Sequence, residues 1–248
     1  MTALILALAA GAVIGLSLGA LGGGGSVLAV PALIYLLGFT PVAATTAGLV
    51  IVALTSATAL TAHARHGHVR WRTGLLFAAA GTGPAMLGSA LAANLPAGAL
   101  SAGFATVAAV AAVRMLRPGR ADDAVRETRP GHAAAAGAGL GAVTGVLGVG
   151  GGFLAVPALV SVLGLRMREA VGTSLLVITV NSLAALGLRG GTVDHLDWTV
   201  VAPFAGAAVL GAWDGRRLAA KLKGSTLQRA FAVALLAVAV SMFVDAVL

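Results

Sequence analysis

The sequence contains no cysteine and only 8 acidic residues among its 248 positions. The absence of cysteine excludes disulfide bonds, thiolate metal sites and cysteine nucleophiles. Charged residues make up 10% of the chain and hydrophobic residues 59%, against about 25% and roughly 45–50% in soluble proteins. This composition excludes an ordinary soluble enzyme and a nucleic-acid-binding protein, even though the net charge is +8.

Long stretches of the chain carry no Asp, Glu, Lys or Arg. The first charged residue is Arg65. Further uncharged stretches cover 73–113, 130–165, 170–188, 198–213 and 230–244. A helix that crosses a bilayer needs about 20 mostly apolar residues. The pattern therefore predicts an all-α polytopic membrane protein embedded in the lipid bilayer.

The sequence is internally repeated. When it is shifted by 126 positions, residues 11–38 fall on 137–164, and 16 of these 28 positions are identical. The match includes the run Leu-Ala-Val-Pro-Ala-Leu and the glycine cluster just before it. A weaker match continues at a shift of 127. Self-similarity of this kind indicates a duplicated structural unit.

Each half is predicted to hold a broken apolar segment followed by three spanning helices. The halves are 1–117 and 132–248, joined by a charged cytoplasmic linker over 118–131. The broken segments cover 2–37 and 132–164. The predicted spanning helices cover about 43–64, 73–94 and 99–116 in the first half and about 170–189, 198–214 and 227–247 in the second.

Basic residues in the loops indicate the orientation, because Lys and Arg gather on the cytoplasmic side. The loops at 65–72, 166–169 and 215–229 are basic, as is the linker, whereas the turns at 38–42 and 94–98 carry no Lys or Arg. Six full spans place all the basic loops in the cytoplasm only if each broken segment enters the membrane and leaves it on the same side. The halves then have opposite orientations, which predicts the inverted-topology repeat of many secondary transporters.

Glycine clusters interrupt both broken segments at matching places. Segment 26–37 would rise about 18 Å as a helix, too little for a hydrocarbon core about 30 Å thick. We therefore predict re-entrant hairpins whose glycine-rich tips lie near the midplane. The half-helices that start near Ser26 and Phe153 would then point unpaired N–H groups toward the centre, where they favour an anion.

The predicted substrate-binding residues are the glycines of both clusters and neutral donors on adjoining helices. They are Gly22, Gly23, Gly24, Gly25, Ser26, Gly148, Gly150, Gly151, Gly152, Thr45, Thr46, Thr173, Ser174 and Asn181. Pro31 and Pro157 are assigned a structural role. Three alternatives stay open: the clusters can be plain helix breaks, the Ser and Thr hydroxyls can bond to carbonyls of their own helices, and Asn181 can bond to a neighbouring helix.

Six other glycines recur at a spacing of four, a pattern typical of close helix packing. They are Gly11, Gly15, Gly19, Gly137, Gly141 and Gly145. We assign them to helix contacts.

The glycine-rich break followed by a proline, present at 19–33 and again at 145–159, resembles the TauE/SafE family of sulfite exporters and toluene-sulfonate uptake permeases. The resemblance covers essentially the whole chain. It implies an inner-membrane transporter for a small sulfur-containing anion such as sulfite or an organosulfonate, with coupling to the proton gradient. Val149 and Gly152 stand where the first copy has Gly23 and Ser26, so the half-sites need not be equivalent.

No residue pattern supports catalysis, a cofactor or a metal site. The phosphate-binding lysine motif is missing, which excludes ATP-driven transport by this chain alone. We expect His63, His66 and His68 to lie in a solvated loop, because their spacing matches no zinc-ligand pattern. The alternative to a transporter is a non-transporting membrane scaffold or assembly subunit. Proton coupling and a homo-oligomeric state stay open.

Overall fold

The computed structural model describes residues 2–23, 26–92, 97–116, 130–146, 152–187 and 196–247. Within these ranges the regular elements are helices, which confirms the predicted all-α fold for the described chain. The first half contains α1 (Thr2–Leu21), α2 (Ser26–Pro31), the π-helix η1 (Ala32–Leu36), α3 (Pro41–Arg65), α4 (Trp71–Ala92) and α5 (Ala97–Leu116). The second half contains α6 (Pro130–Val146), α7 (Gly152–Ser161), α8 (Met167–Gly187), α10 (Trp198–Lys221) and α11 (Gly224–Val247). Most of the predicted linker lies outside the described residues.

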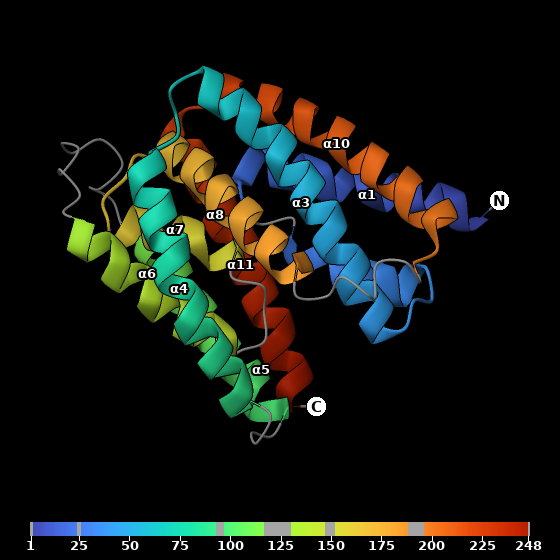
Figure 1. Cartoon of the computed structure of the whole chain (residues 1–248), viewed down its shortest axis with the longest axis horizontal. Coiled ribbons are helices and arrows are strands. Elements are labelled where there is room, and N and C mark those ends of the chain that lie inside the picture. Colours follow the sequence, from blue (N-terminus) through green and yellow to red (C-terminus); the bar gives the residue numbers. More distant parts are fainter. Residues whose placement is uncertain are drawn as a thin grey trace.

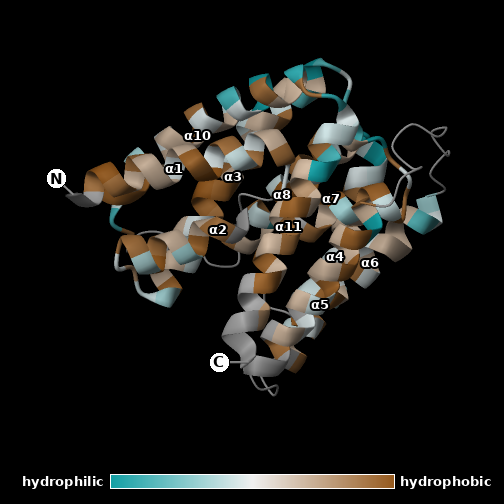
Figure 2. Ribbon diagram, turned by 180° about the vertical axis from the view of Figure 1, so that it is seen from behind, coloured by the Kyte–Doolittle hydropathy of each residue, from teal (hydrophilic) through white to brown (hydrophobic). Residues whose placement is uncertain are grey.

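Four described helices are long and apolar enough to cross a membrane: Leu4–Leu21, Pro41–Arg65, Trp71–Leu91 and Met167–Gly187. Hydrophilic residues gather at the end of the molecule where α3 and α10 finish, whereas the flanks of the helices are largely hydrophobic (Figure 2). Large apolar side chains that face outward are favourable in lipid and unfavourable in water. The chain is therefore a multi-pass membrane protein.

Each half packs its helices against helices of the other half (Figure 1). We call α1 with α10 and α6 with α4 the exchanged pairs, because each joins the first helix of one half to α4 or its counterpart α10 in the other half. Helix α1 packs mainly against α10, while α6, the counterpart of α1 in the repeat, packs mainly against α4, the counterpart of α10. Two further pairs consist of counterparts, α3 with α8 and α5 with α11. The duplication that is visible in the sequence thus extends to the packing of the helices. The opposite membrane orientation of the halves stays a prediction.

Glycine ridges hold the exchanged pairs together, which confirms their assignment to helix contacts. A Cβ atom at Gly15 of α1 would collide with the backbone of Ala208 in α10. A Cβ atom at Gly141, the counterpart of Gly15, would collide with the backbone of Gly81 in α4. Because Gly81 and Ala208 are also counterparts, both halves use the same close approach of backbones.

Gly141→Ala is expected to prevent α4 from packing on α6, because the added methyl group would overlap backbone that cannot move aside alone. The matched control is Gly139→Ala on the same helix, where the methyl group meets no atom within 4 Å. That change should even favour the helix by up to about 1 kcal/mol. Size-exclusion profiles in mild detergent should show aggregation for the first variant and a single symmetric peak for the second. Identical profiles would contradict the packing role.

The first broken segment begins with a long helix. Helix α1 has 20 residues and rises about 30 Å, so its length suffices to cross the bilayer. The return arm is shorter: α2 ends at Pro31, which lacks the N–H group of a regular α-helical ladder, and continues as η1. The re-entrant path of both broken segments stays a prediction.

Helix α10 continues to Lys221, beyond its predicted end at 214. The charged residues there lie on a helix rather than in a loop, and Arg217 and Asp214 form an i,i+3 ion pair across one turn of it. The first charged residue of α10, Asp214, therefore does not mark the end of the helix.

Candidate functional site

A cavity of about 430 Å³, which we call the central cavity, lies between α3, α4, α6 and α8. Its size is typical of a small-molecule site. Small and apolar residues form most of the lining, and none of the lining residues in the described part of the chain is charged. The polar lining residues are Thr45, Thr82, Ser89, Thr144, Asn181 and Ser182. The cavity can therefore offer hydrogen bonds but no fixed charge.

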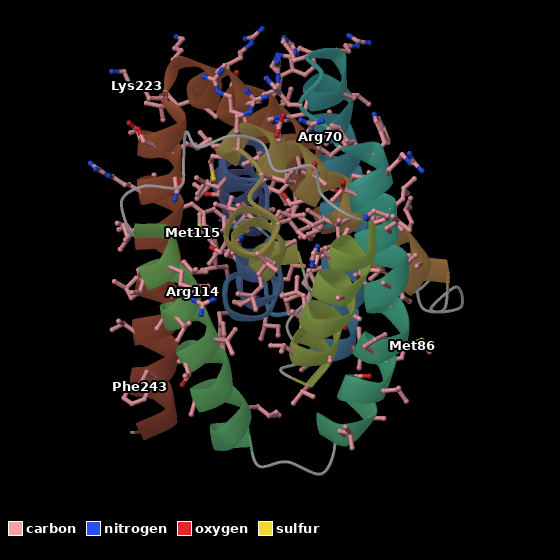
Figure 3. All side chains as sticks on the ribbon, turned by 90° about the vertical axis from the view of Figure 1, so that its left-hand side faces the viewer. Arg70, Met86, Arg114, Met115, Lys223 and Phe243 are labelled. Atoms are coloured by element: carbon pink, nitrogen blue, oxygen red, sulfur yellow. The ribbon has the colours of Figure 1, made fainter. Side chains whose placement is uncertain are left out.

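The central cavity lies away from the basic end of the molecule. We define the basic end as the loop 66–70, the start of α8 and the turn between α10 and α11. Arg168 joins two of these parts, since its Nη2 donates to the carbonyl oxygens of Ala220 and Leu222. Arg70 and Lys223 lie at this end, and Met86, which lines the cavity, lies far from it (Figure 3).

The side chain of Asn181 has unused hydrogen-bonding capacity in the cavity. Its Oδ1 atom is buried and accepts no hydrogen bond. In contrast, the hydroxyl groups of Thr82 and Thr144 donate to carbonyl oxygens of their own helices. The oxygen and the NH₂ group of an amide have nearly the same shape. Rotation about the last torsion would therefore place an N–H donor where Oδ1 now lies.

The N-terminus of α7 also reaches the central cavity. Gly152 is the first residue of this 10-residue helix, is buried, and lines the cavity. The first N–H groups of a helix have no partner within the helix and carry a partial positive charge. The predicted site residues Gly148, Gly150 and Gly151 precede α7 and lie outside the described residues.

The glycine turn of the first half packs against helices of the second half. Gly22 is buried with φ +82°, and Gly23 is buried beside it. A Cβ atom at Gly22 would lie 2.7 Å from Oγ of Ser174 and 3.2 Å from atoms of Val171 and Val156. Neighbouring atoms therefore occupy the space beside this turn. The predicted residues Gly24 and Gly25 lie outside the described residues, and Ser26 is the first residue of α2.

The remaining predicted donors are engaged with backbone. The hydroxyl groups of Thr45 and Thr46 donate to the carbonyl oxygen of Val42, and that of Ser174 donates within α8. Thr173 Oγ1 accepts a hydrogen bond of 3.1 Å from the backbone N–H of Arg70. The central cavity thus brings together three predicted residues, Thr45, Gly152 and Asn181. Its described lining does not include Gly22, Gly23, Thr46, Thr173 or Ser174.

The model of the TauE/SafE sulfite exporter family matches residues 7–242, almost the entire sequence. The chain belongs to this family. Two relatives from Xylella fastidiosa, strains 9a5c and Temecula1, are each 35% identical over 246 residues, which cover 96% of this chain and 94% of the relative. Both are named "Probable membrane transporter protein". No solved structure matches the chain at a significant level.

This TauE/SafE protein also contains a buried carboxylate that the sequence interpretation did not single out. The Glu169 side chain is 5% exposed and accepts hydrogen bonds from Arg70 at 2.9 Å and Arg166 at 2.8 Å. The bond to Glu169 raises the pKa of the Arg166 guanidinium above its usual value. One signal was available: Glu169 is the single acidic residue between Glu127 and Asp194.

Proposed function

We propose that this protein is a secondary transporter that carries a small sulfur-containing anion, sulfite or an organosulfonate, across the inner membrane. Membership of the TauE/SafE family supports this proposal, as do the names of the two Xylella relatives. The observation that carries it is the central cavity, which is lined by the first residue of α7 and by Asn181, whose Oδ1 has no hydrogen-bond partner.

The chemistry of the central cavity fits a small oxyanion. Sulfite and sulfonates present three oxygen atoms on one sulfur, and each oxygen can accept hydrogen bonds from several directions. A helix N-terminus stabilises such a charge without a Lys or Arg. Because no described lining residue is charged, the anion would be held by dipoles alone. Binding of this kind is weak enough to permit release, which transport requires.

The exchanged helix pairs support an inverted repeat with two conformations. In inverted-repeat transporters the two halves exchange their roles as the site opens to one side and then to the other. Here the glycine break of the second half reaches the cavity at Gly152, whereas the break of the first half is packed at Gly22. We assign this asymmetry to an outward-facing state, in which the basic end is cytoplasmic and closed.

Counterflow of radiolabelled sulfite into proteoliposomes tests the proposal. Asn181→Leu keeps the branched shape of the side chain but removes both polar groups. Loss of one hydrogen bond to a charged ligand costs about 1.5–3 kcal/mol, so we expect counterflow to fall by roughly 10- to 150-fold at low substrate. The matched control is Thr82→Val, which lines the same cavity but whose hydroxyl is bonded to its own helix. Its counterflow should change by less than about twofold.

Equal counterflow in Asn181→Leu and the wild type would remove Asn181 from the site. Absence of wild-type counterflow with sulfite, thiosulfate, sulfoacetate and taurine would favour the alternative, a membrane scaffold or assembly subunit. The same assay with an imposed pH gradient tests coupling to protons, for which none of the described cavity-lining residues offers a titratable group.

A further inference from the structure

A second, smaller cavity of about 60 Å³ lies at the basic end. It lies between the ends of α1 and α3, the loop after α3, the start of α8, the last turns of α10 and Leu227 of α11. It shares no lining residue with the central cavity. Its polar lining residues are His63, His66, His68, Arg168 and Arg216, and the others are apolar. Every polar group that faces this cavity within the described chain is thus an imidazole or a guanidinium.

Two buried side chains that line this cavity have unused hydrogen-bonding capacity. His63 is 8% exposed, its ring lies beside the backbone of Gly19, and at least one of its two nitrogens has no other partner. Nε of Arg216 is also buried and unpaired. The expectation of a solvated loop was wrong for His63, because α3 extends to Arg65 and carries this side chain into the protein. Buried polar groups are normally bonded, so Nε of Arg216 and the second nitrogen of His63 are free to bond to a ligand.

The charges around the small cavity select an anion. Arg217 faces Asp214 at 3.7 Å, whereas the described ion pairs include no carboxylate partner for Arg168 or Arg216. Arg168 is fixed by two backbone carbonyl oxygens, and Arg216 lies over the ring of Trp213 at 5.4 Å. Two guanidinium groups in a confined space repel a metal cation and attract an oxyanion.

We propose that the cavity between His63, Arg168 and Arg216 is a second anion-binding site, which takes one small inorganic oxyanion of the size of sulfite or sulfate. The ring of His63 and Nε of Arg216 donate hydrogen bonds to it, and Arg168 supplies further positive charge. The volume suits such an ion, since it corresponds to about four water-sized positions. Burial and the charge of Arg168 lower the pKa of His68.

The internal repeat gives this site a place in the molecule. Val171 and Arg216 line the small cavity, and their counterparts in the other half, Thr45 and Ser89, line the central cavity. The small cavity and the part of the central cavity near Thr45 and Ser89 therefore occupy equivalent positions in the two halves. In the proposed orientation, the small cavity is the one on the cytoplasmic side. If the protein transports as proposed, the small site is the cytoplasmic binding station of the same anion. Anion binding itself does not rest on the proposed function.

Fluorescence of Trp213 reports occupation of this site directly. The chain has three tryptophans, and Trp71 and Trp198 are 50% and 45% exposed, so both can be replaced by Phe. In that background, sulfate or sulfite titrated at constant ionic strength against chloride should give a saturable change. Arg216→Gln and His63→Leu should each weaken the apparent affinity at least tenfold. The matched control is Arg217→Gln, which also lies over Trp213 at 5.8 Å but does not line the cavity.

Thermal unfolding of the same variants provides a second readout, because a ligand that binds the folded state raises the Tm. Sulfate should raise the Tm of the wild type and of Arg217→Gln, and not that of Arg216→Gln. Absence of saturable binding, or equal affinity in both arginine variants, would overturn the proposal. Asn181→Leu separates the two sites: it should retain the Trp213 signal while counterflow is lost. Binding without any counterflow would leave this site standing and remove the transport function.

Discussion

Gly22→Ala is expected to abolish sulfite counterflow and to destabilise the fold by about 2–5 kcal/mol. Gly22 has φ +82°, a conformation that costs other residues about 1–2 kcal/mol. The added methyl group would also lie 2.7 Å from Oγ of Ser174 and 3.2 Å from Cα of Val171. Overpacking of this kind costs about 1–3 kcal/mol. The turn could no longer pack against α8, and the glycine break of the first half would shift.

The matched control for this change is Gly38→Ala. Gly38 has nearly the same conformation, with φ +70°, but a Cβ atom there meets nothing within 4 Å. It should therefore cost about 1–2 kcal/mol and leave counterflow near the wild-type level. The Tm and the counterflow of both purified variants would be compared. An equal loss of Tm in the two would show that only the backbone conformation matters and that contact with α8 does not.

The helices and the glycine ridges that pack them were predictable because membrane insertion leaves simple marks on a sequence. Stretches without charge indicate the spanning helices, since the lipid core excludes charged groups. Glycines spaced by four indicate helix contacts, and the backbone neighbours of Gly15 and Gly141 confirm that assignment. The repeat placed counterparts such as Phe77 and Phe204 at equivalent contacts with α6 and α1. These features depend on local composition and period.

The site could be predicted only in part, because its assembly depends on packing between distant segments. Nothing in the two glycine clusters shows that Gly152 lines a cavity while Gly22 packs against Ser174. The hydroxyl oxygen of Thr173 accepts a hydrogen bond from the backbone N–H of Arg70, which is 103 residues away. The burial of His63 follows from the end of α3 lying near Ala20 of α1. Such contacts follow from the tertiary fold and not from the spacing of residues.

The second large effect is expected at Glu169, whose charge is balanced by two arginines from different segments. Glu169 is buried, whereas the side chains of Arg70 and Arg166 are 44% and 60% exposed. Arg70 belongs to the loop between α3 and α4, so its bond to Glu169 fastens that loop to α8. At the positions equivalent to Arg70 and Glu169, the sequence has Asp197 and Ala43. The same ion pair therefore cannot form at the opposite end.

Loss of either arginine alone should be mild, and loss of both should be severe. Each arginine is partly exposed, and the one that remains still pairs with the carboxylate, so Arg70→Ala or Arg166→Ala should cost at most about 1 kcal/mol. The double variant leaves a buried charge without a partner, which costs about 3–5 kcal/mol. A double-mutant cycle of unfolding free energies in mixed micelles should therefore show strong non-additivity.

Glu169→Gln in the double-alanine background is the decisive companion variant, because it removes the charge and keeps the shape of the side chain. Most of the lost stability should return, since an uncharged amide in that position needs no counter-ion. If the closed basic end depends on this ion pair, the double variant should also make loop 66–70 more accessible to a water-soluble protease, and Glu169→Gln should not reverse that exposure. Strictly additive single changes would mean that each arginine acts independently, and the carboxylate would then not be the centre of the contact between the loop and α8.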